Sequence, residues 1–254
     1  MNYVTVLFLV VASALVVAVA TGLVQRFLAL DIRRQHHEIG NPVYLQIGVM
    51  FAVLLAFVFS EVWSEYNIAG QAINGECGAL HGAAMLAHDL PDQKGLPVER
   101  AIVTYAKTVI NVEWPALQQR HASPDAVNDF QGVIDAAAHL DLTRPGDLSV
   151  QSQILSLLTE AHGFRETRVF QANQGLSAFI WLVLIVYTIV LTAFVLFAGV
   201  ESRIGHMIFS GVSAASVIIV LALVRMLDYP FEGPMTLSYS DFATMMQRVA
   251  QLFG

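Results

Sequence analysis

Residues 41–63, NPVYLQIGVMFAVLLAFVFSEVW, decide the fold because no charged side chain interrupts them before Glu61. An α-helix rises about 1.5 Å per residue, so about 20 apolar residues cross the roughly 30 Å hydrocarbon core of a bilayer. Three further stretches are as long and as apolar, namely residues 3–24, 176–200 and 204–227. The sequence therefore predicts an all-α membrane protein with four transmembrane helices.

The composition of the whole chain supports a membrane protein. Of its 254 residues, 56% are apolar and 13% are charged, whereas charged residues make up about 25% of an average soluble domain. The mean hydropathy is +0.61. A net charge of −7 leaves no basic surface for nucleic acid. The single cysteine, Cys77, can form neither an internal disulfide nor a cysteine-based metal site.

The longest interval between the apolar stretches, residues 64–175, predicts a helical extramembrane domain. It carries 13 acidic and seven basic residues, and no run of alternating β-branched residues indicates a strand. The domain should continue the second transmembrane helix to about residue 88. The expected divisions are residues 1–63 (first two transmembrane helices), 64–175 (helical domain), 176–228 (third and fourth transmembrane helices) and 229–254 (extramembrane tail).

The tail should end in a short amphipathic helix over residues 238–253. Its apolar side chains recur at helical spacing, at Phe242, Met245, Met246, Val249 and Leu252. This face can pack on the protein's own helical domain, which is the favoured interpretation, or bind a membrane surface or a partner protein.

The second helix carries the most informative pattern for function, a stripe of polar and small side chains at alternating spacings of four and three. Such spacing places residues along one face of a helix. The stripe fits a water-lined path where several copies meet, or a helix–helix seam held by hydrogen bonds. The pore-lining candidates are Ser60, Ser64, Asn67, Gln71, Asn74, His81 and His88.

Several charged residues are candidates for functional positions. Glu61, Glu65 and Glu76 lie off the stripe, where they could form a charged rim that attracts cations, or a solvated or salt-bridged surface. Arg225 and Asp228 are three residues apart near the end of the fourth span, so we expect a membrane ion pair.

No sequence motif predicts catalysis, and we expect neither an enzyme nor a cofactor. The GxSxG, P-loop, GxGxxG and HExxH patterns do not occur. His36-His37-Glu38 carries side chains that can bind metal, but adjacent side chains on a loop seldom converge on one ion. No metal site is therefore predicted.

The basic residues near the span ends predict the orientation. Arg26, Arg33 and Arg34 lie in the first connection, and Arg203 lies between the third and fourth spans. The positive-inside rule places these connections in the cytoplasm and the helical domain outside, on the periplasmic side. Arg165 and Arg168, before the third span, argue for the opposite orientation; they could also pair within the protein, bind lipid phosphate or attract an anion.

Two motifs carry a resemblance to a known family. The first is Glu113-Trp114-Pro115, and the second is Leu227-Asp228-Tyr229-Pro230-Phe231-Glu232-Gly233. Their order, over about residues 40–242, resembles the bestrophin-like domain-of-unknown-function family of bacterial and plant membrane proteins. That family is distantly similar to bestrophins, which are pentameric ion channels with a pore lined by the second span. The motif residues that the resemblance picks out are Glu113, Trp114, Pro115, Asp228, Pro230, Phe231 and Gly233.

The resemblance implies a homo-oligomer, with a pentamer as the expected assembly, in a bacterial inner membrane, with small ions as partners. The dense acidic calcium clasp of bestrophins has no counterpart, because only Asp228, Glu232 and Asp241 are available, and calcium takes about six to eight oxygens. The expected function is a passive ion channel with the second helix lining the path. The alternative is a non-conducting membrane scaffold or an accessory subunit of a larger complex.

Overall fold

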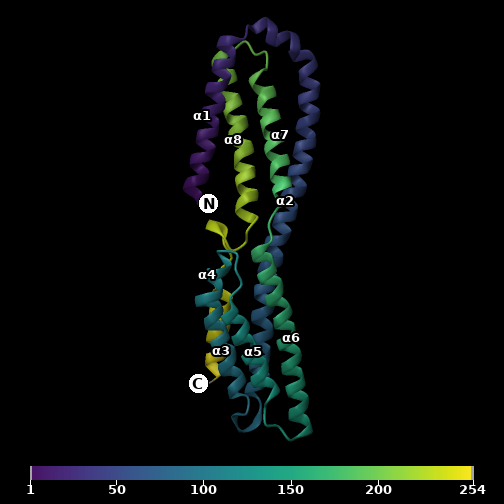
Figure 1. The fold of residues 1–254 in the computed structure, drawn as a ribbon, viewed down its shortest axis with the longest axis vertical. Helices are drawn as coiled ribbons and strands as arrows, with labels where there is room; N and C mark the ends of the chain where they lie inside the picture. The colour runs from purple at the N-terminus through teal and green to yellow at the C-terminus, as the bar shows by residue number, and fades with distance from the viewer. Residues whose placement is uncertain (1, 253–254) are drawn as a thin grey trace. The chain divides into compact units, whose positions relative to one another are not determined.

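A computed structural model describes residues 2–252, apart from the side chains of residues 35–39 (Figure 1). The described residues form helices and connecting segments and contain no strand. The chain divides into two compact units. We call Met1–Ser64 with Gly175–Asp228 the membrane unit, and Glu65–Gln174 with Tyr229–Gly254 the helical unit. The long helix α2 (Leu30–His88) contributes residues to both.

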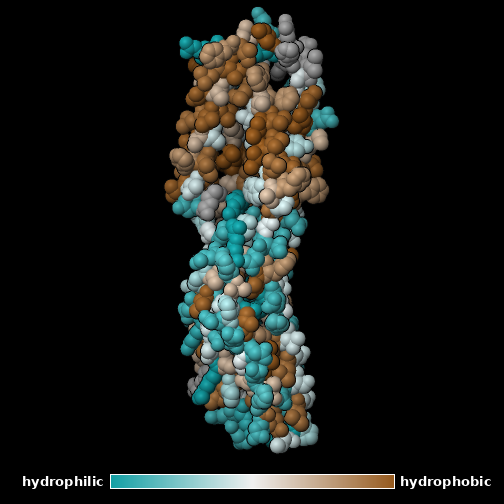
Figure 2. Space-filling view, viewed as in Figure 1, coloured by the Kyte–Doolittle hydropathy of each residue, from teal (hydrophilic) through white to brown (hydrophobic). Residues whose placement is uncertain are grey.

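The membrane unit contains four helices that are long and apolar enough to cross a membrane. They are α1 (Tyr3–Phe27), α2, α7 (Ala178–Leu196) and α8 (Arg203–Leu227). Large apolar side chains such as Phe8, Phe57 and Phe179 are exposed on this unit, and Figure 2 shows such residues gathered over its surface. A surface of this kind suits lipid and confirms the prediction of an all-α protein with four candidate spans.

Helices α1 and α8 pack closely because small residues face each other. A Cβ atom on Gly211 would lie 2.9 Å from the carbonyl oxygen of Ala14. Nearby, Thr21 Oγ1 and Ser210 Oγ are 2.7 Å apart and share a hydrogen bond. Small residues with interhelical hydrogen bonds are the usual basis of helix association in membranes.

Helix α2 begins before the apolar stretch that opens at residue 41. Only two residues, Leu28 and Ala29, separate α1 from α2, so Pro42 lies inside the helix and not at its beginning. Proline removes one helical hydrogen bond, but transmembrane helices tolerate this loss where local adjustments and neighbouring groups satisfy the freed carbonyl. The apolar stretch from residue 41 is thus the membrane-length part of a helix that already begins at Leu30.

The helical unit packs its remaining helices around a single apolar core. Ser123 accepts a hydrogen bond from the Ala126 N–H and caps the start of α5 (Pro124–Ala138). The elements are η1 (Pro91–Gln93), α3 (Leu96–Thr108), η2 (Val109–Glu113), α4 (Trp114–Leu117), α5 (Pro124–Ala138), α6 (Pro145–Asn173), η3 (Gly233–Met235) and α9 (Ser240–Leu252).

The tail helix α9 docks on the helical unit. Phe242, Met245 and Val249 are buried in its apolar core, and Met246 and Leu252 pack against that core. These are the five apolar residues of the amphipathic pattern, so the favoured interpretation of the tail is confirmed.

Helix α3 continues into a π-helical turn, η2, directly before Pro115. A proline ring clashes with the carbonyl four residues earlier in an α-helix. The wider π turn relieves this crowding, and π turns often occur at functional sites. The π turn places Glu113 in the core, where its side chain is completely buried.

Candidate functional site

The polar stripe on α2 is uncovered in the protomer. Ser60 and Ser64 are exposed in the membrane unit; in the helical unit Asn67, Gln71, Asn74 and His88 are exposed and His81 is half-buried. The opposite face of α2 is buried in the apolar core, with Ala69, Ile73, Leu80, Ala83 and Ala84. Helix α2 therefore has one face in the core and an opposite polar face that is mostly exposed in the described part of the chain.

The tail helix adds charge beside this stripe. A cavity of about 210 Å³ lies between α2 and α9 in the helical unit. Asn74, Gly78 and His81 line it from α2, and Asp241, Thr244, Met245 and Arg248 line it from α9. Thr244 and Arg248 are not among the site residues predicted from the sequence. The signal that could have found them is their spacing of four residues, which places both on one face of α9. That face overlaps the apolar face at Met245.

The three acidic candidates do not share one environment. Glu61 is exposed and Glu65 is half-buried, whereas Glu76 is completely buried in the helical unit. A solvated rim position is therefore wrong for Glu76. Glu76 is buried because it pairs with a cationic residue of α6 that lies far away in the sequence.

Arg168 is that partner, at the centre of a buried ionic cluster that consists of Glu76, Tyr105, Glu113, Arg165 and Arg168. Its Nε–H donates to Glu76 Oε2 at 2.8 Å, and its Nη2 donates to Glu113 Oε2 at 2.7 Å. Arg165 donates to the other oxygen of Glu113 at 2.5 Å, and the Tyr105 hydroxyl donates to Glu76. Two carboxylates thus meet two guanidinium groups, and their formal charges cancel.

The cluster favours the charged form of Arg168 and the neutral form of Tyr105. Burial lowers the pKa of Arg168, but Glu76 and Glu113 outweigh burial and hold that pKa well above its ordinary value. Burial, helped by the charge of Glu76, raises the pKa of Tyr105 well above its ordinary value. Tyr105 is therefore a permanent hydrogen-bond donor at neutral pH, and Arg168 a permanent cation.

The two family-type motifs meet in the helical unit. Trp114 packs edge-on against Phe231, with ring centroids 5.3 Å apart and an angle of 72°, and its Nε1–H donates to the Leu237 carbonyl at 3.3 Å. Between the two contacts, Gly233 has φ of 75°, which favours glycine. Pro115 follows Trp114 at the start of α4, and the Pro230 carbonyl accepts from Leu237 N–H at 2.8 Å. The motifs therefore build the core and do not form a cleft of their own.

Asp228 closes the end of α8 in the membrane unit. The residue is 2% exposed. Its Oδ1 accepts from the Leu176 N–H at 2.7 Å, and its Oδ2 accepts from Trp181 Nε1–H at 3.4 Å. The side chain thus ties α8 to the start of α7. The ion pair with Arg225 stays a prediction.

The described residues contain no group of three or more histidine, cysteine or acidic side chains that could hold a metal ion. The side chains of His36, His37 and Glu38 lie outside the part of the chain that the structure describes. Of the acids considered for a calcium clasp, Glu232 instead pairs with Arg120 at 2.8 Å.

Four membrane-length helices and a helical unit built around buried ion pairs define a polytopic α-helical membrane protein. The family model of the Bestrophin-like domain matches residues 11–242, and the chain belongs to that family. A search of curated proteins gives no match at a significant level.

Solved structures share the fold. A single-residue variant of a membrane protein is 12% identical, with a TM-score of 0.76 over 98% of this chain and 99% of that chain. A bacterial bestrophin homologue from Klebsiella pneumoniae is 14% identical, with a TM-score of 0.72 over 94% of this chain and 97% of that chain. At such identities the similarity establishes the fold alone.

Proposed function

We propose that the protein is a passive ion channel whose path is lined by the polar stripe of α2 in a homo-oligomer. The observation that carries this proposal is the exposure of Asn67, Gln71 and Asn74 on a helix whose opposite face is buried in the core. Amide side chains can replace part of the water around an ion, so a ring of them suits conduction. Membership of the bestrophin-like family and the resemblance to pentameric bestrophin channels favour five copies.

The competing function is a non-conducting scaffold or accessory subunit, in which the same amides hydrogen-bond between helices. The specific observation in its favour is that the stripe combines amide with small side chains, as in packed membrane helices. Ion flux through liposomes that contain the purified protein separates the two. A complete absence of flux over a range of ions and pH values would support the scaffold function and contradict the channel.

A pair of matched variants tests the lining of the path. Asn74→Leu would place an apolar ring in the path, and apolar constrictions close by losing their water. We expect it to reduce conductance strongly while the oligomer stays intact. Asn128→Leu makes the same change at an exposed position of α5 and should leave conductance unchanged. Equal currents in both variants would contradict the proposed lining.

Assembly can be tested at Gly78, which is exposed and has no atom within 4 Å of an added Cβ in the protomer. Gly78→Leu adds a side chain beside the open cavity between α2 and α9, and it should disturb mainly the contacts between copies. We expect a smaller oligomeric mass in native mass spectrometry. Gly132, equally open on α5, supplies the control Gly132→Leu, which should keep the wild-type mass.

We propose a bacterial inner-membrane location with the helical unit on the periplasmic side. The basis is the positive charge at Arg26, Arg33, Arg34 and Arg203. Reporter fusions after residue 203 should report cytoplasm, and fusions within the loop at residue 93 should report periplasm. A cytoplasmic signal at residue 93 would reverse the orientation.

A further inference from the structure

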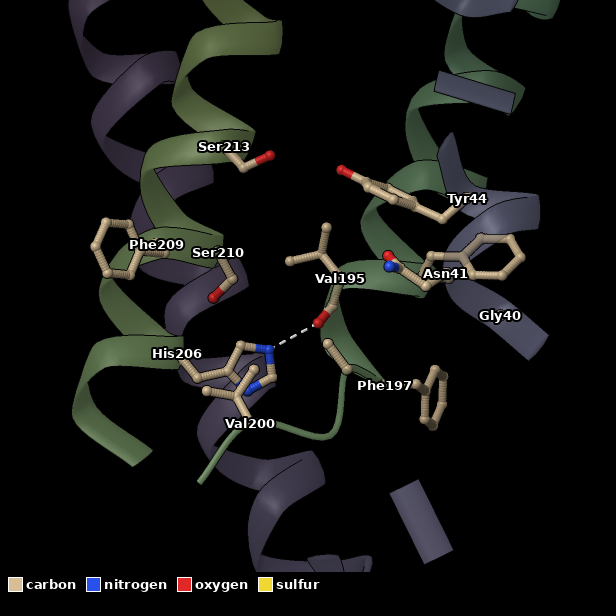
Figure 3. A pocket seen from close by; sticks show the side chains of 13 residues that line it. Gly40, Asn41, Tyr44, Val195, Phe197, Val200, His206, Phe209, Ser210 and Ser213 are labelled. Carbon is tan, nitrogen blue, oxygen red and sulfur yellow. Dashed lines mark hydrogen bonds between the residues drawn. The ribbon is translucent and has the colours of Figure 1, made fainter. Parts of the chain in front are cut away.

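A cavity of about 580 Å³ lies within the membrane unit (Figure 3). Its walls come from the part of α2 near Gly40, from the end of α7 with the residues that follow it, and from the first half of α8. Much of the lining is hydrocarbon, from side chains such as Phe194, Val195, Phe197 and Phe209. Its volume is within the range of about 300–1,000 Å³ that holds small-molecule ligands.

Three polar side chains are directed into this cavity. Figure 3 shows the hydroxyls of Tyr44 and Ser213 and the amide of Asn41 turned toward the same space, from α2 on one side and α8 on the other. No hydrogen bond joins these three groups to another residue in the described part of the chain. Polar groups in a membrane-spanning unit are costly without a partner, so they point to a ligand that accepts hydrogen bonds.

The other polar groups of the cavity are already engaged. The Ser210 hydroxyl bonds with Thr21, and the Val195 carbonyl accepts from His206 Nε2–H at 2.8 Å. His206 Nδ1 lies 2.7 Å from Gln25 Nε2, so both ring nitrogens of His206 are engaged within the protein. Among the lining residues that the structure describes, none is acidic, lysine or arginine, and the polar part of a ligand should therefore be uncharged.

We propose that this cavity binds the acyl chain of a membrane lipid, with the ester carbonyl of the chain hydrogen-bonded by Tyr44, Ser213 and Asn41. An ester carbonyl is neutral, accepts hydrogen bonds and is joined directly to a long hydrocarbon chain. These three properties match the uncharged donors and the apolar walls. The helices around the cavity are long and apolar enough to cross a bilayer, so acyl lipid is the molecule at highest concentration beside it.

The test compares defined lipids on purified, delipidated full-length protein by native mass spectrometry. A monoacylglycerol carries the ester carbonyl without phosphate, and its alkyl ether analogue lacks only that carbonyl. A lysophosphatidylcholine carries both the ester and a phosphate. We expect the two esters to bind with similar affinity and the ether about fivefold more weakly, because a net hydrogen bond contributes about 1 kcal/mol. Equal binding of ester and ether, or binding of the phospholipid alone, would overturn the assignment.

Variants locate the binding at the cavity. Tyr44→Phe removes only a hydroxyl and should weaken ester binding by about fivefold. The control Tyr187→Phe removes a hydroxyl from a tyrosine of α7 that stacks on Phe51 outside the cavity lining, and should bind as wild type. Equal affinities for the two variants would contradict the proposal.

A blocking variant provides an independent test. Ser213→Phe should fill the space and abolish lipid binding, whereas Ser216→Phe, at an exposed position of the same helix, should not. Retained binding in Ser213→Phe would overturn the site. A second combined result would also overturn the site, namely a wild type that retains no lipid and a Ser213→Phe variant with a changed oligomeric mass. A neighbouring copy would then occupy the cavity.

Discussion

Arg168 and Glu76 form a two-point ion pair in which both side chains are completely buried, with N–O distances of 2.8 and 3.3 Å. Trp114 and Phe242 lie beside the guanidinium, with ring centroids 5.6 and 5.3 Å from its carbon. Water is excluded from this pair, so its partners depend on each other for charge compensation.

Arg168→Met should destabilise the protein by about 3–5 kcal/mol, because Glu76 and Glu113 would remain buried without their shared cation. The free energy of unfolding in detergent measures this loss. Arg144→Met serves as a control, since its ion pair with Asp147 is on the surface, and it should cost at most about 1 kcal/mol. Adding Glu76→Leu to Arg168→Met should recover part of the loss; no recovery would show that the charges are not coupled.

The pH dependence of stability should contain a contribution from Glu99. Burial raises the pKa of this carboxyl, while His88, 3.5 Å away, opposes the rise. The folded state therefore binds this proton more tightly than the unfolded state, and the resulting stability is lost as pH rises through the folded pKa. Compared with Glu99→Gln, the wild type should lose melting temperature as pH rises above about 4.3, the ordinary value for glutamate. If the melting temperatures of the two proteins change in parallel with pH, Glu99 makes no such contribution.

Gly211→Val should separate α1 from α8, because even a Cβ atom would approach the Ala14 carbonyl too closely. Overpacking of this kind costs about 1–3 kcal/mol, which thermal unfolding in detergent would detect. Val212→Ile adds a methylene at the adjacent exposed position and should be neutral. A stable Gly211→Val variant would mean that the two helices can move apart without loss.

If the α2 stripe conducts, Arg248 should influence charge selectivity, because it lines the same cavity as Asn74 and His81. Arg248→Gln removes a positive charge there and should shift the reversal potential in a salt gradient toward cation permeation. Gln247→Glu changes the net charge of the chain by the same amount at a residue outside the cavity lining, and should shift it less. Equal shifts would indicate a diffuse surface charge and not a local effect of Arg248.

The membrane helices and the docking of α9 were predictable because each follows from local composition or from helical periodicity. The environment of Glu76 could not be predicted from the sequence. Its sequence neighbours, Gly75 and Cys77, give no sign of a cation, and Arg168 lies 92 residues away in the chain. The π turn before Pro115 was equally hidden, since the sequence shows a proline that interrupts a helix but not how the backbone accommodates it.

The three sequence segments that supply the ionic cluster emerge from the ribosome at different times. Glu76 and Glu113 are synthesised 52 or more residues before the arginines they contact. Until α6 follows, the two carboxylates have no cation to accompany them into an apolar interior, and hydration favours keeping them at the surface. Burial of the two carboxylates should therefore wait for Arg165 and Arg168 on α6, and Phe242 of α9 can complete the core only after them.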